Sequence, residues 1–409
     1  MDTSLWKANT PAKFWHACPG VELPRGAWEA AAQASAQETL GAPFADDAEI
    51  ESLLSQTLGE GQFGPSHWQL SRAKRLYYEL KPLLPRGVIR FIRRIYRFPA
   101  EASFPLSWPV EERYARFQWE VMRHLMSVAW HDAIPFIHFW PEGHRYAFVL
   151  THDIETAHGQ ARARAVADLE EGLGFRSSFN FVPEGYQVDL SLVAELFERG
   201  FEIGIHGLRH DGKLFSSQAE FSRRVTRINR YLQEFGAVGF RAPLTHRHPG
   251  WMQELEIEYD SSFFDTDPFE PIPGGTMSIW PFFIGRFVEL PYTLPQDYTL
   301  MAILGEKTPR IWAEKVDLIE RYHGMALLNT HPDYLKAPAN FKMYADFVDA
   351  MKQRGGYWHA LPRKVAAWWR ARAEASSLET LPGAVQATAR LVNGNLTIDI
   401  RQRGPEGPP

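Results

Sequence analysis

Short apolar runs alternate with amphipathic segments from residue 146 to about residue 330, which is the pattern of repeated strand and helix units. The apolar runs predict strands at 146–151, 178–182, 201–206, 237–241, 288–291 and 325–330. Apolar residues spaced three and four apart predict helices at about 160–173, 190–199, 218–235 and 310–322. This alternation predicts an α/β fold of parallel strands covered by helices.

The N-terminal and C-terminal parts of the chain do not show this alternating pattern. The first part is mostly helical and irregular, with an Ala-rich stretch at 28–45, and it contains no recognisable catalytic motif. Near the other end, Asn393 and Gly394 stand between alternating apolar runs and predict a hairpin. We therefore expect three regions: a mainly helical N-terminal accessory region at 1–140, the α/β region at 141–372, and a C-terminal hairpin and tail at 373–409.

Composition narrows the chemistry. With 409 residues the chain can bury one large core and a smaller second one. The formal net charge of −5 argues against nucleic acid as a partner, because nucleic-acid-binding domains usually carry a basic excess. The single cysteine, Cys18, excludes an internal disulfide framework and a thiolate-rich zinc site. Any metal must therefore be held by His, Asp or Glu.

The sequence also predicts a location. The N-terminal residues lack the basic start and apolar stretch of a secretion signal, and no run of about 18 apolar residues occurs. We expect a cytoplasmic protein. One segment, RGVIRFIRRIYRF at 86–98, interleaves arginines with large apolar residues. It is interpreted first as a basic helix docked on the protein, and second as a peripheral contact with anionic lipid.

Polar side chains follow one predicted strand after another. They are Asp153, His206, Arg241 and His331, together with Asp260, which follows the short run IEY at 257–259. In a barrel of alternating strands and helices, the loops after the strands all open on one face, so these residues are expected to converge. Core packing does not explain them, because a charge removed from water without a partner is costly.

Two histidines within this set have metal-ligand spacing. His206 and His210 are four residues apart, which places both imidazoles on one side of a helical turn. Taken alone such a pair is a weak signal in a chain with 15 histidines. Asp153 and Glu155 add carboxylates at the end of a strand. Two imidazoles and one carboxylate leave an open position for water, as in a catalytic metal site.

The order of short motifs resembles a known family. THDIE, HGLRH, FRAP, YDSS and LLNTH, in this order, resemble the five signature blocks of the polysaccharide deacetylases, also called carbohydrate esterase family four or the NodB-homology family. The resemblance covers about residues 146–369. It implies a distorted, incomplete (β/α) barrel of the seven-stranded type. It also implies a divalent metal ion, with Zn²⁺ first and Co²⁺, Mn²⁺ or Ni²⁺ as alternatives.

The resemblance assigns roles to the first two blocks. Asp153 becomes the general base, and Glu155, His206 and His210 become the metal ligands. Most members have adjacent aspartates in the first block, whereas here Ile154 intervenes and the second acid is Glu155. This D-x-E variant leaves open which of the two acids is the base.

The later blocks supply the remaining roles. Arg241 would orient the base, and His331 would act as general acid with Asp260 tuning its protonation. Pro243 and Leu244 would contact the substrate, and the backbone N–H of Leu244 could stabilise an oxyanion. Many members have an aromatic residue at the position of Leu244, but a backbone donor does not depend on the side chain.

The implied function is hydrolysis of the N-acetyl group of a sugar unit, in a cell-surface polysaccharide or its precursor. The expected partner is therefore an N-acetylated carbohydrate. Two alternatives stay open. One is an amidohydrolase of small cyclic amides or ureides on the same fold, and the other is a carbohydrate-binding relative without catalysis.

Overall fold

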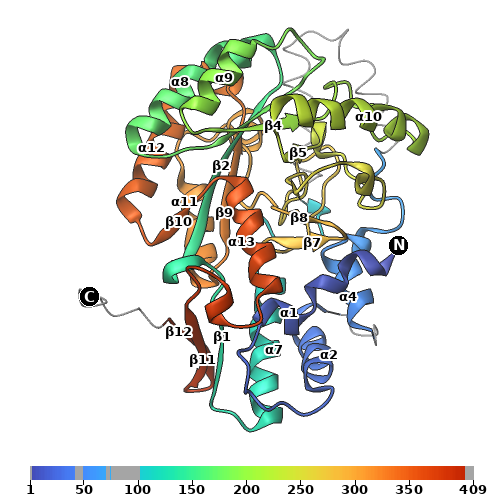
Figure 1. Cartoon of the computed structure of the whole chain (residues 1–409), viewed down its shortest axis with the longest axis vertical. Coiled ribbons are helices and arrows are strands. Elements are labelled where there is room, and N and C mark those ends of the chain that lie inside the picture. The colour runs from blue at the N-terminus through green and yellow to red at the C-terminus, as the bar shows by residue number, and fades with distance from the viewer. Residues whose placement is uncertain (1, 42–48, 71–73, 75–101, 401–409) are drawn as a thin grey trace.

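The computed structural model describes residues 2–41, 49–70, 74 and 102–400. A curled sheet with helices on its outer face forms the upper part of the molecule in Figure 1. Its parallel strands are β2 (Tyr146–Ile154), β3 (Ser178–Phe181), β4 (Glu202–His206), β5 (Gly239–Arg241), β6 (Tyr259–Asp260), β8 (Phe287–Glu289), β9 (Met325–Thr330) and β10 (Tyr357–His359). The six strands that the hydrophobic pattern predicts are all present.

The parallel strands close into a ring. Neighbours follow the order β9, β2, β3, β4, β5, β6 and β8. Beyond β8 the chain reaches β9, where Leu294 forms a parallel bridge with Leu328 and the N–H of Leu294 donates to the carbonyl of Leu327 at 3.1 Å. Closure by one short contact, and the brevity of β5 and β6, make the ring irregular. The predicted distorted, incomplete (β/α) barrel is confirmed.

Two strands of this sheet lie outside the ring, and neither they nor β6 within it were predicted. β7 (Phe282–Ile284) pairs antiparallel with β8. β10 pairs with the beginning of β2, at the end of the ring opposite to the residues that follow the strands. Both are only three residues long, which is too short for a periodic signal in the sequence.

The helices around the sheet begin and end at residues suited to those positions. Thr156, Asp189 and Ser217 accept backbone N–H groups as N-caps of α8, α9 and α10. α8 and α10 end at glycines in the left-handed conformation. The bounds are α8 (Ala157–Leu173), α9 (Leu190–Glu198), α10 (Gln218–Phe235), α11 (Arg310–Arg321), α12 (Pro338–Arg354) and α13 (Pro362–Glu374). The four predicted helices are confirmed, and α12 and α13 are additional.

The N-terminal and C-terminal parts of the chain meet below the barrel (Figure 1). Helix α2 (Ala27–Thr39) packs against α7 (Arg113–Ala129), so the expected helical extension is present. Strand β1 (Ala133–Ile137) pairs antiparallel with β11 (Gln386–Val392), which pairs with β12 (Asn395–Ile400). The predicted hairpin is confirmed, and its Asn393–Gly394 turn has positive φ at both residues. That β1 joins this hairpin was not predicted.

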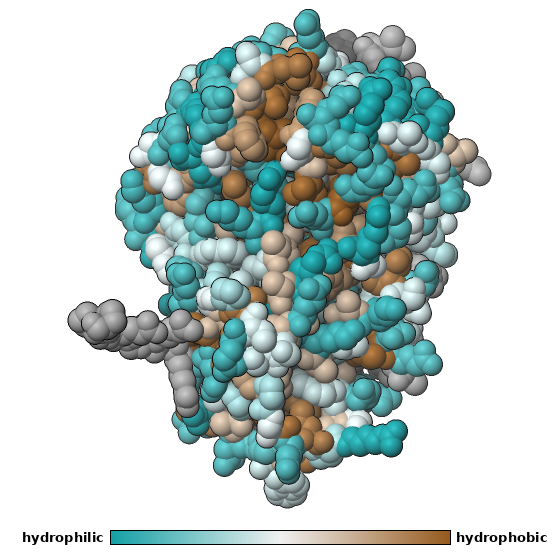
Figure 2. Space-filling model, viewed as in Figure 1, coloured by the Kyte–Doolittle hydropathy of each residue, from teal (hydrophilic) through white to brown (hydrophobic). Residues whose placement is uncertain are grey.

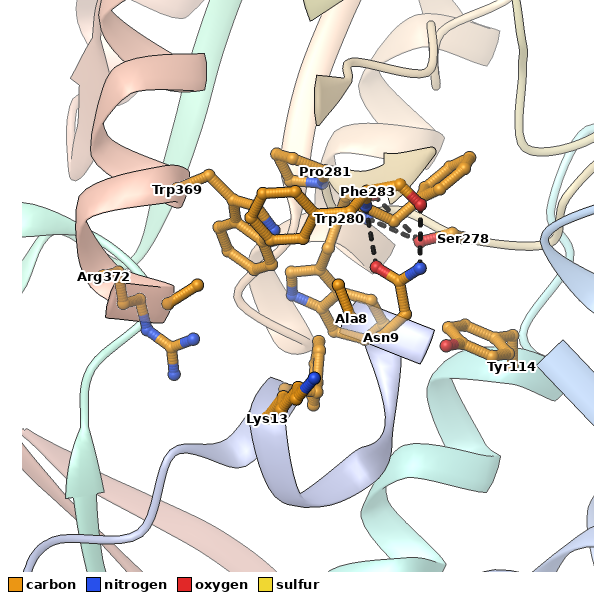
Figure 3. A pocket seen from close by; sticks show the side chains of 13 residues that line it. Ala8, Asn9, Lys13, Tyr114, Ser278, Trp280, Pro281, Phe283, Trp369 and Arg372 are labelled. Atoms are coloured by element: carbon orange, nitrogen blue, oxygen red, sulfur yellow. Dashed lines mark hydrogen bonds between the residues drawn. The ribbon is translucent and has the colours of Figure 1, made fainter. Parts of the chain in front are cut away.

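The first residues of the chain are fixed to the edge of the sheet. After the 3₁₀ helix η1 (Thr3–Asn9), the Asn9 amide donates to the carbonyl of Phe283 at 2.8 Å and accepts from its N–H at 2.7 Å. Figure 3 shows the Asn9 amide directed at Phe283, with Trp280 and Trp369 also lining the small hollow beside them. The amide thus pairs with β7 as a neighbouring strand would. Short helices α1 (Pro11–Trp15) and α4 (Ile50–Thr57) complete this part.

The basic segment at 86–98 lies outside the described residues. None of the described helices combines the length and apolar character needed to cross a bilayer. The face drawn in Figure 2 is largely hydrophilic, with apolar atoms gathered near the top, where α8 and α9 lie in Figure 1. Leu190 and Phe197 on α9 are among the exposed large apolar side chains.

Candidate active site

A hollow of about 580 Å³, including its open mouth, lies where the ring strands end. Its floor and walls come from segments far apart in the sequence, because parallel strands deliver the residues that follow them to one face of the barrel. The residues lining it are Asp153, Glu155, His206, His210, Ala242, Leu244, Thr245, Glu270, Pro271, Gln296, Tyr298, His331 and Tyr334.

Strand alternation decides which residues of β2 face the hollow. Thr151 and Asp153 point into the ring, where Arg241 donates from Nη2 to Thr151 Oγ1 at 3.0 Å and places Nε 3.4 Å from Asp153 Oδ1. His152 points outward, and its Nε2 lies 2.7 Å from Glu170 of α8. Successive side chains of a strand point to opposite faces, so His152 belongs to the helix layer and Asp153 to the site.

Three side chains at the hollow could hold a metal ion. Ligand atoms of Glu155, His206 and His210 all lie within 4.8 Å of one another, and His210 Nε2 is 2.9 Å from Glu155 Oε1. His206 Nδ1 lies 3.2 Å from the carbonyl oxygen of Arg241, and this contact fixes the orientation of the His206 imidazole. The other nitrogen of His206, Nε2, is buried and has no hydrogen-bond partner among the described residues.

That unpaired nitrogen fits a metal ligand. Burial lowers the pKa of His206 to about 4, so the imidazole is neutral at physiological pH. A neutral imidazole that donates one N–H to a carbonyl presents the lone pair of its second nitrogen, which is how most metal-binding histidines are arranged. Burial alone would raise the pKa of Glu155, but His210 outweighs it and lowers that pKa, which keeps the carboxylate charged. The donor set suits Zn²⁺ and similar ions.

Asp153 is held as an anion beside this group. Asn180 donates to its Oδ1 at 3.0 Å and Asn329 donates to its Oδ2 at 2.9 Å. Burial would raise the pKa of Asp153, but the neighbouring imidazoles, Arg241 and the hydrogen bond from Asn180 lower it. The sequence interpretation missed Asn180 and Asn329. Both stand on ring strands with inward-facing side chains, and that position was the signal available in the sequence.

His331 faces Asp153 and Glu155 from the end of β9. Its Nε2 lies 3.9 Å from Asp153 Oδ2 and 3.7 Å from Glu155 Oε1. Its Nδ1 lies 2.7 Å from Oδ1 of Asp297, and its backbone N–H donates to Oδ2 of the same carboxylate. Burial would lower the pKa of His331, but Asp297 raises it to about 10. The imidazole is therefore protonated, with Nε2–H directed at the site.

The expected pairing of Asp260 with His331 is wrong. Asp260 accepts hydrogen bonds from the N–H and hydroxyl of Ser262 at 3.0 and 2.7 Å, and it lies opposite Glu289 on the adjacent strand. Burial raises the pKa of Glu289 well above its usual range, and the charge of Asp260 adds to this effect. Two neighbouring buried carboxyl groups that repel each other in this way cannot both be ionised. Asp297 takes the predicted role, and it also follows a strand segment, the one that closes the ring.

The third block contributes backbone more than side chains. Leu244 lines the hollow with φ +58° and Thr245 with φ +53°, so this turn is held in a left-handed conformation. Pro243 does not line the hollow. It packs behind Gly207, where a Cβ atom would come within 2.4 Å of the proline ring. Pro243 thus holds the loop against the turn between His206 and His210, and Leu244 faces the hollow.

The N-terminal region supports this loop. Arg247 is buried, donates from Nη1 to the carbonyl of Thr245 at 2.8 Å, and donates from Nε to Glu60 at 2.7 Å. Glu60 also accepts the N–H of Gly275 at 2.8 Å. Burial would raise the pKa of Glu60, but Arg247 and His67 lower it to about 2. The accessory region therefore contributes a buried ion pair directly behind the wall of the hollow.

No model of a protein family and no curated protein matches the sequence. Solved structures resemble it over little more than half its length. A Mycobacterium smegmatis protein described as a polysaccharide deacetylase has 18% identity and a TM-score of 0.44, with 57% of this chain and 93% of that chain covered. The allantoinase Puue has 16% identity and a TM-score of 0.46, with 57% and 92% covered.

A third structure is a family 4 acetyl xylan esterase from Clostridium thermocellum, in complex with a cobalt ion. It has 14% identity and a TM-score of 0.36, with 54% of this chain and 90% of that chain covered.

Proposed function

We propose that the chain is a metal-dependent hydrolase that removes the N-acetyl group from a sugar unit of a polysaccharide or its precursor. One observation carries the proposal. A carboxylate and two imidazoles in metal-ligand geometry share a hollow with an ionised aspartate, Asp153, and a protonated histidine, His331. An amide needs a base for the attacking water and an acid for the leaving nitrogen, and this site offers both.

Glu155, His206 and His210 would hold the ion. A divalent ion bound there would lower the pKa of a coordinated water towards about 7 and polarise the amide carbonyl. The contact of Glu155 with His210, and the separate hydrogen bonds of Asp153, support Asp153 as the base and Glu155 as the ligand.

Asp153 would take the proton of the attacking water. Each of its oxygens already accepts one amide N–H, from Asn180 and Asn329, and a carboxylate oxygen can accept a second hydrogen bond. Arg241 keeps the group ionised and fixed in position. The proton would therefore move to an oriented carboxylate rather than to bulk water.

His331 would donate a proton from Nε2 to the leaving nitrogen, while Asp297 holds its Nδ1–H. Amines leave poorly unless they are protonated, so this acid is as necessary as the base. The backbone N–H of Leu244 would donate to the oxyanion, and such a donor contributes about 3 kcal/mol to lowering the barrier.

The test is an acetate-release assay on a panel of N-acetyl sugars, with allantoin added to represent cyclic ureides. The protein is assayed after chelation and again after Zn²⁺ or Co²⁺ is restored. We expect acetate from at least one sugar, loss of release on chelation, and recovery with metal. His206→Ala should abolish release. His248→Ala is a matched control, because His248 stacks on Trp251 outside the hollow. Turnover by the His206 variant, or ring opening of allantoin to an open-chain ureide acid without acetate release from any sugar, would contradict the proposal.

A further inference from the structure

Glu270 lines the same hollow and belongs to none of the sequence motifs. Its carboxyl group is buried with 3% of the residue exposed, and three side chains reach it. Tyr292 and Gln296 donate to Oε1 at 2.7 Å each, and the Thr245 hydroxyl contacts Oε2 at 2.9 Å. Oε1 is therefore saturated, whereas Oε2 has room for one more hydrogen bond.

A purely structural role does not account for this acid. The cations whose charges act on Glu270 are Arg247 and His331. Each is already paired with another carboxylate, Glu60 and Asp297 respectively. Asp267 lies close to Glu270, and the two carboxyl groups repel each other. Burying a charge without a cationic partner is costly, and a glutamine would accept from Tyr292 and Gln296 equally well. An acid at this wall is explained if its carboxylate binds a ligand inside the hollow.

The rest of the lining fits a neutral, hydroxyl-bearing ligand. No lysine or arginine occurs among the described residues that line the hollow, and its charged side chains are Asp153, Glu155, Glu270 and the protonated His331. Tyr298 and Tyr334 add two aromatic rings whose centroids are 5.6 Å apart. Aromatic faces and carboxylates together are suited to the apolar faces and hydroxyl groups of a sugar ring.

We propose that Glu270 is a specificity-determining residue: its Oε2 binds a hydroxyl of the sugar, so the hollow accepts a neutral sugar and rejects one with a carboxylate or phosphate at that position. This inference rests on the proposed function. Glu270 is also linked to the proposed base, Asp153, through a chain of hydrogen bonds. Gln296 accepts from Asn329 at 3.3 Å, and the same Asn329 amide holds Asp153.

The test compares substrates in wild type and Glu270→Gln. The probes are methyl N-acetylglucosaminide, its monodeoxy derivatives and its uronic acid form. In the wild type, one deoxy derivative should lose about 10- to 100-fold in kcat/KM, because its hydroxyl partner is missing. The uronic acid should be disfavoured by at least as much. In Glu270→Gln an amide N–H replaces Oε2, so the preference for the neutral sugar over the uronic acid should shrink by about tenfold or more.

Glu202→Gln is the control. Glu202 is also buried and accepts from Tyr259, but it lies at the beginning of β4, the end away from His206 and the hollow. This variant should leave unchanged both the preference for the parent sugar over its deoxy derivative and the preference for the neutral sugar over the uronic acid. Equal kcat/KM for neutral and uronic substrates in the wild type, or an unchanged ratio in Glu270→Gln, would overturn the inference while leaving the deacetylase proposal intact. Absence of acetate release from every sugar would instead overturn the proposed function, and this inference with it.

Discussion

Glu202 and His206, at the two ends of strand β4, are buried in different ways. At the amino ends of the strands, Glu202 accepts from the Tyr259 hydroxyl at 2.9 Å and from the N–H of Arg363 at 3.0 Å. At the carboxyl ends, His206 Nε2 is buried without a hydrogen-bond partner among the described residues. Native proteins satisfy nearly all buried polar atoms, so an unsatisfied one beside other possible metal ligands supports the proposed metal site.

Arg372 shows the same contrast for a buried cation. It lies below the barrel, where its guanidinium donates to the carbonyls of Trp15, Ile137 and His138 and so joins the N-terminal region to α13. Burial lowers its pKa to about 9. Arg241, in contrast, is directed at the Asp153 carboxylate. The first arginine serves the fold, and the second serves the site.

The largest effect is expected for Asp153→Asn. An asparagine keeps the shape but has a single acceptor oxygen, so it can accept from only one of Asn180 and Asn329, and it cannot take a proton. We expect kcat to fall by about 10³-fold or more, with metal binding retained. Acetate release and metal content measured on the same preparation check this. A variant that lost its metal would place Asp153 among the ligands instead.

Asp297→Asn should have a smaller effect that grows with pH. Burial lowers the pKa of His331 and Asp297 raises it, to about 10 in sum, so the wild-type imidazole stays protonated below that pH. Without Asp297 the pKa falls, and the acid is lost as pH rises through the new value. We expect kcat/KM relative to wild type to drop by about 10- to 100-fold between pH 6 and pH 9.

Asp260→Asn is the matched comparison. Because Asp260 contacts Ser262 and Glu289 and not His331, its pH profile should keep the wild-type shape. A profile that shifts with Asp260 and not with Asp297 would restore the original assignment.

Glu60→Gln should act mainly on stability. It leaves Arg247 buried without its anion, which costs about 3–5 kcal/mol. Since the pKa of Glu60 is lowered to about 2, the stabilisation by this pair is present above the unfolded pKa and is lost only as pH falls towards 2. Urea denaturation at pH 7 and pH 3 measures both effects. A destabilisation below about 1 kcal/mol at pH 7 would argue against support of the site loop by the N-terminal region.

The smallest effect on turnover is expected for Glu202→Gln at the amino end. The glutamine can still accept from Tyr259, so we expect a loss of about 1 kcal/mol in unfolding free energy and unchanged kcat. A large fall in kcat would mean that the two ends of the barrel are not independent.

The sequence allowed prediction of what is local or periodic. Six ring strands, four helices and the hairpin follow from apolar spacing and turn residues, and the residues after the strands follow from the topology. The partner of His331 was predicted wrongly as Asp260, because several acids follow ring strands and the curvature of the sheet decides that Asp297 reaches it. The Glu60–Arg247 pair could not be predicted from the sequence either, because 187 positions separate the two residues and only the folded chain brings them together.

The proposed function requires that Glu155, His206 and His210 share one divalent ion beside Asp153. The direct measurement is a Co²⁺ titration of chelator-treated protein, followed by visible absorption and by acetate release from the best sugar of the panel. We predict that both signals saturate at one equivalent, that His206→Ala and His210→Ala lose both, and that Asp153→Asn keeps the absorption and loses the release. Full acetate release by the metal-free wild type, or an unchanged Co²⁺ spectrum in His206→Ala, would contradict it.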